Sequence, residues 1–286
     1  MSKEDKYDAL GQRMKRYEEV ANGQLLIPDL PLYARIDGRH FSKLTKNLGY
    51  PFGPFENISF VFSHIMRMTA NDLMKEFKCD IAETHSDEIS LGWKNIKTAP
   101  FDGKYFKLVS NIASYAGMSF YRNIFNCEKW MTSEKVFGKK AISDIKVLYD
   151  SFPSFDCRIV QLPDLMELVN CFIWRQNDCI RGAINQYAQR WFTHKELLGK
   201  SQDERIEMLS NAGHHLMDID RSVFYGSWLV KKTSIEKIDP KYAQFHPGET
   251  TMLRTKIVPL NLNYRLASDD NKLEILFPNK EDKENA

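Results

Sequence analysis

Apolar residues recur with two different spacings along this 286-residue chain, and the order of the two spacings predicts the fold. Four short apolar segments are typical of strands; they cover residues 30–36, 79–85, 88–93 and 155–162. Between them, residues 55–77 and 107–125 repeat apolar side chains at helical spacing, which indicates helices that pack on a sheet. The order strand, helix, strand, strand, helix, strand predicts an α+β fold with a ferredoxin-like, split βαβ antiparallel sheet.

The segments on either side of this core complete the predicted organisation. A mostly polar helix is expected over residues 5–21, and a long helical segment over residues 164–192. Mixed α and β structure should follow, so we divide the chain into residues 1–165, which hold the predicted sheet, and residues 166–275, a C-terminal α/β extension of the same domain. The polar residues 276–286 predict a disordered tail.

Composition narrows the class of protein. Hydrophobic residues make up 43% and charged residues 27% of the chain, and no apolar run approaches the roughly 20 residues of a membrane helix, so we expect no membrane contact. The charged N-terminal segment lacks the apolar centre of a secretory signal, which favours a cytoplasmic location and leaves a mitochondrial one open. The five cysteines fit neither a disulfide framework nor a zinc pattern, so we expect reduced thiols. A net charge of +2 gives no global attraction to nucleic acid, so RNA binding would depend on local basic runs such as residues 137–140 and 229–232.

Two turns that carry carboxylates provide the candidate chemistry. Asp37 ends the first predicted strand and is followed by Gly38, and Asp87 lies in the predicted hairpin turn. The first strand and the hairpin are neighbours in the predicted sheet, so the two carboxylates should converge on one cation, and paired carboxylates suit Mg²⁺. Gly38, without a Cβ, would let a triphosphate approach the backbone, and its carbonyl could be a further ligand. Each motif alone is also an ordinary turn signal; their joint placement favours the metal site.

Six segments, in this order, resemble the tRNA(His) guanylyltransferase superfamily, and more closely its guanylyltransferase-like branch of 3′-to-5′ polymerases. The segments are GQRMKRYE, RIDGRHFSKLT, THSDEISL, KLVSNIAS, FDCRIVQLP and WRQNDCIRGAIN. The resemblance implies a polymerase-palm-like fold with residues 1–165 as the catalytic region, two Mg²⁺ ions, and ATP for activation of a 5′-phosphate. It also implies the addition of nucleotides from GTP or other nucleoside triphosphates to the 5′ end of tRNA, and a homotetramer.

The resemblance assigns roles residue by residue. It places metal ligands at Asp37, the Gly38 carbonyl and Asp87, with the two aspartates as catalytic residues that bind two ions for an in-line displacement. The implied nucleotide contacts are Asp37, Gly38, Arg39, His40, Phe41, Ser42, Asp87, Glu88, Lys107 and Ser110.

Three basic residues carry open alternatives. Lys107 would contact phosphate, and a solvated lysine at a helix start is the alternative. Arg175 and Arg181 are candidate RNA contacts. Arg175 is three residues before Asp178, so an intrahelical ion pair is the alternative there.

The chain departs from the family pattern in two places. Tyr50 stands where many relatives carry a lysine before Pro-Phe, so the chain differs at one phosphate contact. Residues 179–185, CIRGAIN, stand where guanylyltransferases proper carry His-Ile-Asn-Asn, a motif that helps select their tRNA. This second departure favours template-dependent repair of incomplete tRNA 5′ ends, and the addition of one extra guanosine to tRNA(His) is the alternative.

Two other classes share parts of this pattern. RNA-recognition modules have a ferredoxin-like fold, but the segment ISLGW lacks their expected aromatic pattern. A nucleotidyl cyclase shares the palm and its carboxylates, whereas this chain lacks the second glycine of the cyclase pattern and contains WRQNDC. A cyclase needs no RNA, so incubation with nucleotides alone separates the two activities.

Overall fold

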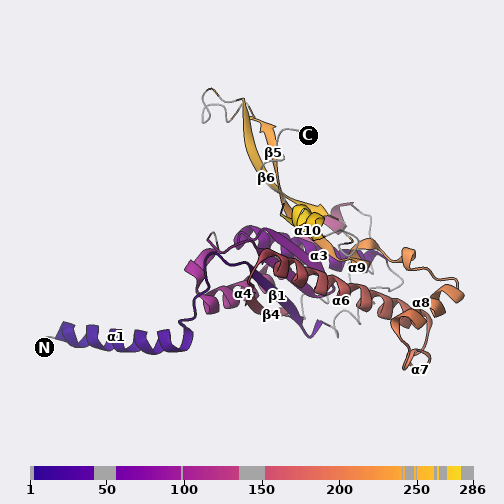
Figure 1. Ribbon diagram of the computed structural model, residues 1–286, viewed down its shortest axis with the longest axis horizontal. Helices are drawn as coiled ribbons and strands as arrows, with labels where there is room; N and C mark the ends of the chain where they lie inside the picture. The colour runs from indigo at the N-terminus through magenta and orange to yellow at the C-terminus, as the bar shows by residue number, and fades with distance from the viewer. Residues whose placement is uncertain are drawn as a thin grey trace.

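A six-stranded antiparallel sheet lies between two layers of helices (Figure 1). The fold is that of a computed structural model, which describes residues 3–41, 56–97, 99–134, 152–239, 241, 248, 250–260, 263 and 269–277. The predicted order of elements is confirmed as β1 (Leu32–Arg39), α3 (Glu56–Glu76), β2 (Ile81–His85), β3 (Glu88–Trp93), α4 (Tyr105–Glu134) and β4 (Ser154–Gln161), with a short 3₁₀ turn η1 (Pro100–Gly103) before α4. The strands lie in the order β4-β1-β3-β2-β5-β6.

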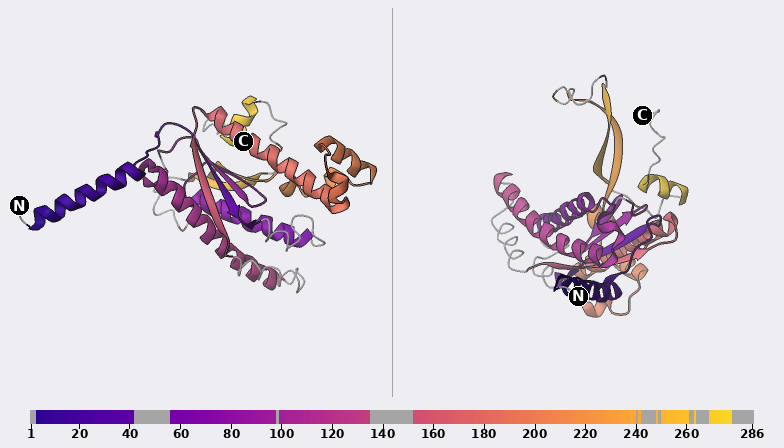
Figure 2. Two further views of the ribbon diagram at one scale, coloured as in Figure 1. Left: turned by 90° about the horizontal axis from the view of Figure 1, so that it is seen from below. Right: turned by 90° about the vertical axis from the view of Figure 1, so that its left-hand side faces the viewer.

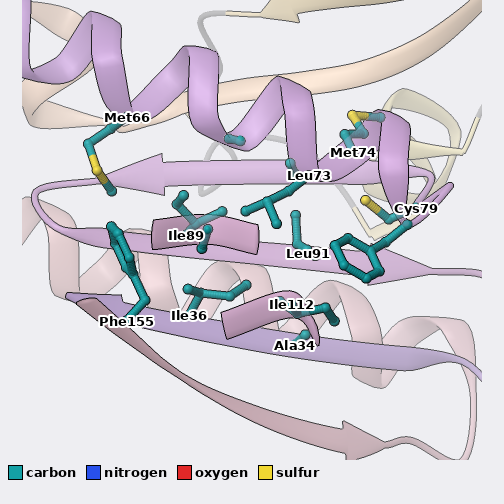
Figure 3. Close-up of a cluster of buried hydrophobic side chains, with 14 of the residues drawn as sticks. Ala34, Ile36, Met66, Leu73, Met74, Cys79, Ile89, Leu91, Ile112 and Phe155 are labelled. Atoms are coloured by element: carbon teal, nitrogen blue, oxygen red, sulfur yellow. The ribbon is translucent and has the colours of Figure 1, made fainter. Parts of the chain in front are cut away.

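One face of the sheet is covered by α3 and α4 and holds the largest apolar cluster (Figure 2, left). Successive strand residues point to opposite faces, and on this face the strands contribute only small or apolar side chains near the centre. Figure 3 shows Ala34 and Ile36 of β1 and Ile89 and Leu91 of β3 in the same cluster as Leu73 and Met74 of α3. The described part of α3 from residue 62 onward buries its aromatic and methionine side chains in this cluster. Core packing therefore accounts for the aromatic and methionine side chains of this part of α3.

The opposite face is covered by α6 (Leu165–Trp191) and α10 (Asp269–Leu276). The side chain of Asp164 caps α6 by accepting a hydrogen bond from the backbone N–H of Glu167, 2.9 Å away. Phe172 of α6 packs edge-on against Tyr33 and tilted against Trp228, both from the sheet. This cluster fixes the first half of α6 on the sheet.

The second half of α6 extends beyond the sheet and carries a third apolar cluster. That cluster is completed by the short elements α7 (His194–Leu197), α8 (Gln202–Asn211), η2 (Leu216–Asp218) and α9 (Arg221–Phe224). The helix predicted over residues 164–192 is thus confirmed as one continuous element.

The strands β5 (Ser227–Lys237) and β6 (Thr251–Leu260) belong to the same sheet, because β5 pairs with β2. Their outer halves pair only with each other and project from the body as a ribbon (Figure 1). The polar helix α1 (Lys3–Asn22) also projects, and its described side chains are exposed. The disordered tail was predicted to begin at residue 276, but Leu276 and Phe277 are buried in the apolar cluster under α6. Residues 278–286 lie outside the described part of the chain.

All five cysteines are free thiols, as expected, and Cys79, Cys127 and Cys179 are buried. Burial raises the pKa of Cys127 to about 11 and that of Cys157 to about 12. A thiol with so high a pKa is protonated near neutral pH and is a poor nucleophile. None of the described helices combines the length and apolar content that crossing a bilayer requires.

The contact between α6 and the sheet predicts the effect of filling one glycine. A Cβ on Gly92 of β3 would lie 2.8 Å from Cγ2 of Ile81 and 2.9 Å from Cε2 of Phe172. We expect Gly92→Ala to lower the free energy of unfolding by about 1–3 kcal/mol through overpacking, measured by guanidinium denaturation. Gly182→Ala in α6 is the control, since nothing lies within 4 Å of its new methyl group; it should gain up to about 1 kcal/mol from helix propensity. Equal effects of the two substitutions would contradict this packing argument.

Candidate active site

The predicted pair of carboxylates lies at one end of the sheet. In the antiparallel register, Asp37 is directly opposite Glu88 of β3 on one side and Asp156 of β4 on the other. The backbone N–H of Gly38 donates to the carbonyl oxygen of Asp87, with an N···O distance of 3.0 Å. This bond joins the end of β1 to the turn between β2 and β3. Asp37 and Asp87 therefore lie on neighbouring backbone segments, one at the end of β1 and the other in the turn between β2 and β3.

The Asp87 carboxyl group is partly buried, and its environment disfavours its negative charge. Burial raises the pKa of Asp87, and the charge of Asp37 raises it further, although a hydrogen bond from the Ser86 hydroxyl, 3.1 Å away, opposes both. A bound cation would relieve the repulsion between two like charges. Among the described residues no group of three or more His, Cys, Asp and Glu side chains is arranged to hold a metal. Two carboxylates and the Gly38 carbonyl form a donor set with few protein ligands, which fits Mg²⁺.

Gly38 is required by the packing of the site. A Cβ at this position would lie 2.6 Å from Cδ2 of Phe41 and 2.9 Å from Cβ of Asp87. Two non-glycine residues near the pair adopt positive φ, His40 at 64° and Ser86 at 49°. Such backbone conformations are strained and concentrate at functional sites. The backbone therefore adopts strained conformations next to both aspartates, where the end of β1 approaches the turn between β2 and β3.

Glu88 and Arg175 form a buried ion pair, which corrects two expectations. Nε and Nη2 of Arg175 donate to the two carboxylate oxygens of Glu88 at 2.5 and 2.8 Å, and both residues are buried. The Glu88 side chain is therefore committed to Arg175 and not open to a nucleotide. Nη2 of Arg175 also lies 2.9 Å from Asp178. The intrahelical ion pair is confirmed, and the buried guanidinium is not positioned for RNA.

Glu83 and His85 of β2 extend this network, and the sequence analysis did not find them. Nδ1 of His85 lies 2.8 Å from Oε1 of Glu83, while Oε2 of Glu83 has no hydrogen-bond partner and is fully buried. Burial lowers the pKa of His85, but the carboxylate of Glu83 outweighs burial, and the net pKa is raised. Burial raises the pKa of Glu88, opposed by His85 and Arg175. Polar side chains two residues apart on a strand that was expected to be apolar were the available signal.

The structure does not bring Lys107 to the carboxylate pair. The hydroxyl of Tyr105, at the start of α4, donates to the carbonyl of Ile159 at 3.4 Å, and Ile159 is opposite Ala34 in the first half of β1. Farther along α4, the ring of Phe120 is 5.3 Å from that of Phe41, near the carboxylates. At 1.5 Å per helical residue, Lys107 and Phe120 are about 20 Å apart. Lys107 is exposed, so its solvated alternative describes its place within this chain.

Ser110 and Phe41 are also corrected as nucleotide contacts. The hydroxyl of Ser110 donates to the carbonyl of Phe106 at 2.8 Å, one turn back in the exposed start of α4. The ring of Phe41 is 1% exposed and packs among the aromatic rings of the core, where it anchors the end of β1.

The remaining predicted contacts stay predictions. Arg39 and His40 are exposed beside the site. Arg181 is exposed and its Nη2 lies 2.6 Å from Oδ1 of Asp178, so an RNA contact of Arg181 stays a prediction. Ser42 and Tyr50 lie outside the described residues.

The buried ion pair predicts a large cost for removing its cation. Arg175→Ala removes both hydrogen bonds to the buried Glu88 carboxylate and leaves, among the described residues, only Arg35 at 4.0 Å, so we expect a loss of about 3–5 kcal/mol in the free energy of unfolding, measured by guanidinium denaturation. Arg181→Ala removes an exposed ion pair on the same helix and should change stability by no more than about 1 kcal/mol.

The pH dependence of the Arg175→Ala variant tests the cause of the loss. Without the guanidinium, burial holds the pKa of Glu88 above its unfolded value. Protonation then stabilises the folded variant below the unfolded pKa of about 4.3, and this contribution is lost as pH rises through the folded pKa. The deficit relative to the unmodified protein should therefore be smaller at pH 5 than at pH 7.5. A deficit that does not depend on pH would mean that lost packing, not a buried charge, is responsible.

Comparison with known proteins identifies the family of the chain. A family model described as tRNAHis guanylyltransferase matches residues 11–163. A tRNA(His) guanylyltransferase of Schizosaccharomyces pombe is 31% identical over 268 residues, which are 90% of this chain and 92% of the relative.

Two solved structures resemble the fold. A bacterial tRNA(His) guanylyltransferase-like protein in complex with ATP matches with a TM-score of 0.61 at 26% identity, over 77% of this chain and 88% of the other. Another, in complex with GTP, matches with a TM-score of 0.62 at 22% identity, over 94% and 98% of the two chains. Since the family model covers more than half of the sequence and the yeast relative nearly all of it, this chain belongs to the tRNA(His) guanylyltransferase family.

Proposed function

We propose that this chain is a template-dependent 3′-to-5′ nucleotidyltransferase that repairs incomplete 5′ ends of tRNA. Nucleotide transfer to the 5′ end of tRNA follows from the family to which the chain belongs. The observation that carries the chemistry is the hydrogen bond from Gly38 to Asp87, which holds Asp37 and Asp87 side by side. The solved relatives in complex with ATP and with GTP support nucleoside triphosphates as substrates.

The strand order supports the finer description of the fold. Strands β4, β1, β3 and β2 are adjacent in that order, and α3 and α4 cover one of their faces. This is the arrangement expected of a ferredoxin-like sheet, on which polymerase-palm-like sites are built. We also propose a homotetramer, from the resemblance to the family.

The residues of the site have different proposed roles. Asp37, Asp87 and the Gly38 carbonyl would hold Mg²⁺, which when bound aligns the attacking oxygen and neutralises triphosphate charge. Arg175 neutralises Glu88 directly beside the pair. Without that ion pair, another negative charge would repel an anionic substrate from the site. Exposed Arg39 is available to an anionic substrate at the end of β1.

Repair is favoured over a single guanosine addition by residues 179–185. Cys179 and Ile180 of this segment are buried, and Arg181 with Gly182 occupies the more open turn where guanylyltransferases proper carry His-Ile-Asn-Asn. We therefore expect this chain, which lacks that motif, to select its nucleotide by base pairing. Guanosine addition to tRNA(His) is the second candidate, favoured by the name of the relative that matches 90% of the chain. Membership in this family argues against a nucleotidyl cyclase.

The first prediction concerns the carboxylates. We expect Asp37→Asn and Asp87→Asn each to reduce nucleotide addition to a 5′-truncated tRNA by about 100-fold or more at saturating Mg²⁺, since each removes a ligand charge. The folded state should not lose stability, because each change removes repulsion between neighbouring carboxylates. The control is Asp156→Asn, on the β4 side of Asp37, which should retain activity. Full activity in either of the first two variants would contradict a shared metal site.

The second prediction concerns templating. A tRNA that lacks its first nucleotide should receive the complement of the opposing base, and each change of that base should change the nucleotide added. Extension should stop once the stem is fully paired, which sequencing of the labelled product can show. Addition of guanosine to full-length tRNA(His), whatever the opposing base, combined with no reaction on truncated tRNA, would replace repair with the second candidate.

A further inference from the structure

Trp174 of α6 stands partly exposed beside the candidate active site and has no role in the chemistry described so far. Its side chain is 49% exposed, whereas tryptophan side chains are on average largely buried. The guanidinium carbons of Arg175 and Arg35 lie 4.6 and 5.8 Å from the indole centroid. Arg35 is two residues before Asp37 on the same face of β1, about 7 Å along the strand. The indole is therefore held close to the carboxylate pair.

The sheet next to Trp174 presents two arginines directly opposite each other. Arg35 of β1 pairs in register with Arg158 of β4. Like charges opposite each other destabilise an antiparallel pair, and the nearest carboxylates are loosely placed: Glu88 is 4.0 Å from Arg35, and Asp156 is 3.5 Å from Arg158. A polyanion over this pair would relieve the repulsion.

The β4 side of this surface is open to solvent, whereas the side chain of Arg35 on β1 is 18% exposed. Arg158 is 58% exposed, and Val160, on the same face of β4 and opposite Tyr33, is 50% exposed. Sites for small ligands bury most of the ligand in a concave pocket. An open surface with an aromatic ring, an apolar residue and two cations suits a large ligand with flat bases and a phosphate backbone instead.

We propose that Trp174, Arg35, Arg158 and Val160 form a platform that receives the terminal base pair of the RNA stem whose 5′ end is extended. The last base stacks on the exposed part of the indole, and the backbone phosphates lie over the two arginines. The stem leaves past the open edge of β4, and its 5′ end points to Asp37. This inference rests on the proposed function, and it adds the surface that positions the end of the RNA.

The test measures RNA binding separately from catalysis. The probe is a fluorescein-labelled RNA hairpin that copies an acceptor stem without its first 5′ nucleotide, and its binding is followed by anisotropy without nucleoside triphosphate. Stacking of one base on an aromatic side chain predicts that Trp174→Ala weakens binding roughly 5- to 100-fold. Trp174→Phe should restore most of it, and the KM for the added nucleotide should stay within about twofold.

Trp191→Ala is the matched control. Trp191 lies on the same helix, is 44% exposed, and has the guanidinium carbon of Arg190 at 5.1 Å from its ring. It is about 25 Å from Trp174 along α6, so binding of the hairpin should be unchanged. Equal losses in Trp174→Ala and Trp191→Ala, or no loss in Trp174→Ala, would overturn the proposal. A rise in the KM of the nucleotide with unchanged hairpin binding would assign the indole to the base of the free nucleotide, and would overturn it as well.

The arginines have a control of their own. Arg158→Ala should reduce the dependence of log Kd on log salt concentration by about one, as expected for one phosphate contact. Arg254 of β6 is equally exposed and lies 3.5 Å from Glu236, just as Arg158 lies 3.5 Å from Asp156. Arg254→Ala should leave the slope unchanged, and a slope that is unchanged in Arg158→Ala would overturn the assignment of Arg158 as a phosphate contact of the platform. If the unmodified protein binds the hairpin through Trp174 but adds no nucleotide, the proposed function fails while the platform stands.

Discussion

The register of β1 between β3 and β4 is the constraint on which the site depends. Side chains alternate between the two faces of a strand, so a shift by one residue would turn Asp37 toward the apolar layer of α3 and α4. The register is fixed because Ala34 and Ile36 are buried on that layer and Tyr33 is buried on the other. Apolar packing on both faces thus positions the carboxylate of Asp37 at the strand end.

The buried ion pair beneath α6 connects stability with the site. Phe172 and Arg175 are three residues apart and lie on the same side of the helix, where one packs on the apolar part of the sheet and the other binds Glu88. Burying a charge is favourable only when a partner and hydrogen bonds compensate its lost hydration. The two bonds from Arg175 meet that condition, and they hold the strand that begins directly after Asp87. A change at Arg175 would therefore act on Asp87, a proposed metal ligand, through the backbone of β3.

The sequence predicts what depends on local periodicity and on the order of the strands. The convergence of Asp37 and Asp87 followed from β1 being a neighbour of the hairpin, which the topology determined before any contact was known. Glu88 and Arg175 could not be paired in this way, since they are separated by 87 residues and the register of α6 on the sheet is set by tertiary packing.

Lys107 was misplaced for a related reason. The sequence motif locates it at the start of a helix but does not say at which end of the sheet that helix begins. Phe41 was misjudged because a motif read as a ligand-binding loop also contained the residue that anchors the loop in the core.

The two faces of the sheet differ in the side chains that they carry. The face under α3 and α4 is almost wholly apolar, and substitutions there would change stability first. The face under α6 changes along β1 from buried Tyr33 to Arg35 and then to Asp37, so apolar, basic and acidic side chains follow each other toward the strand end. A negatively charged RNA end is attracted by the arginines and kept from the carboxylates unless a cation is present. The segment 179–185 follows Arg175 along α6, and Cys179 at its start is close enough to Glu83 and Glu88 for their charges to raise its pKa. The proposed choice of substrate through residues 179–185 would therefore act from the same helix that binds Glu88, while the apolar core under α3 and α4 is not involved.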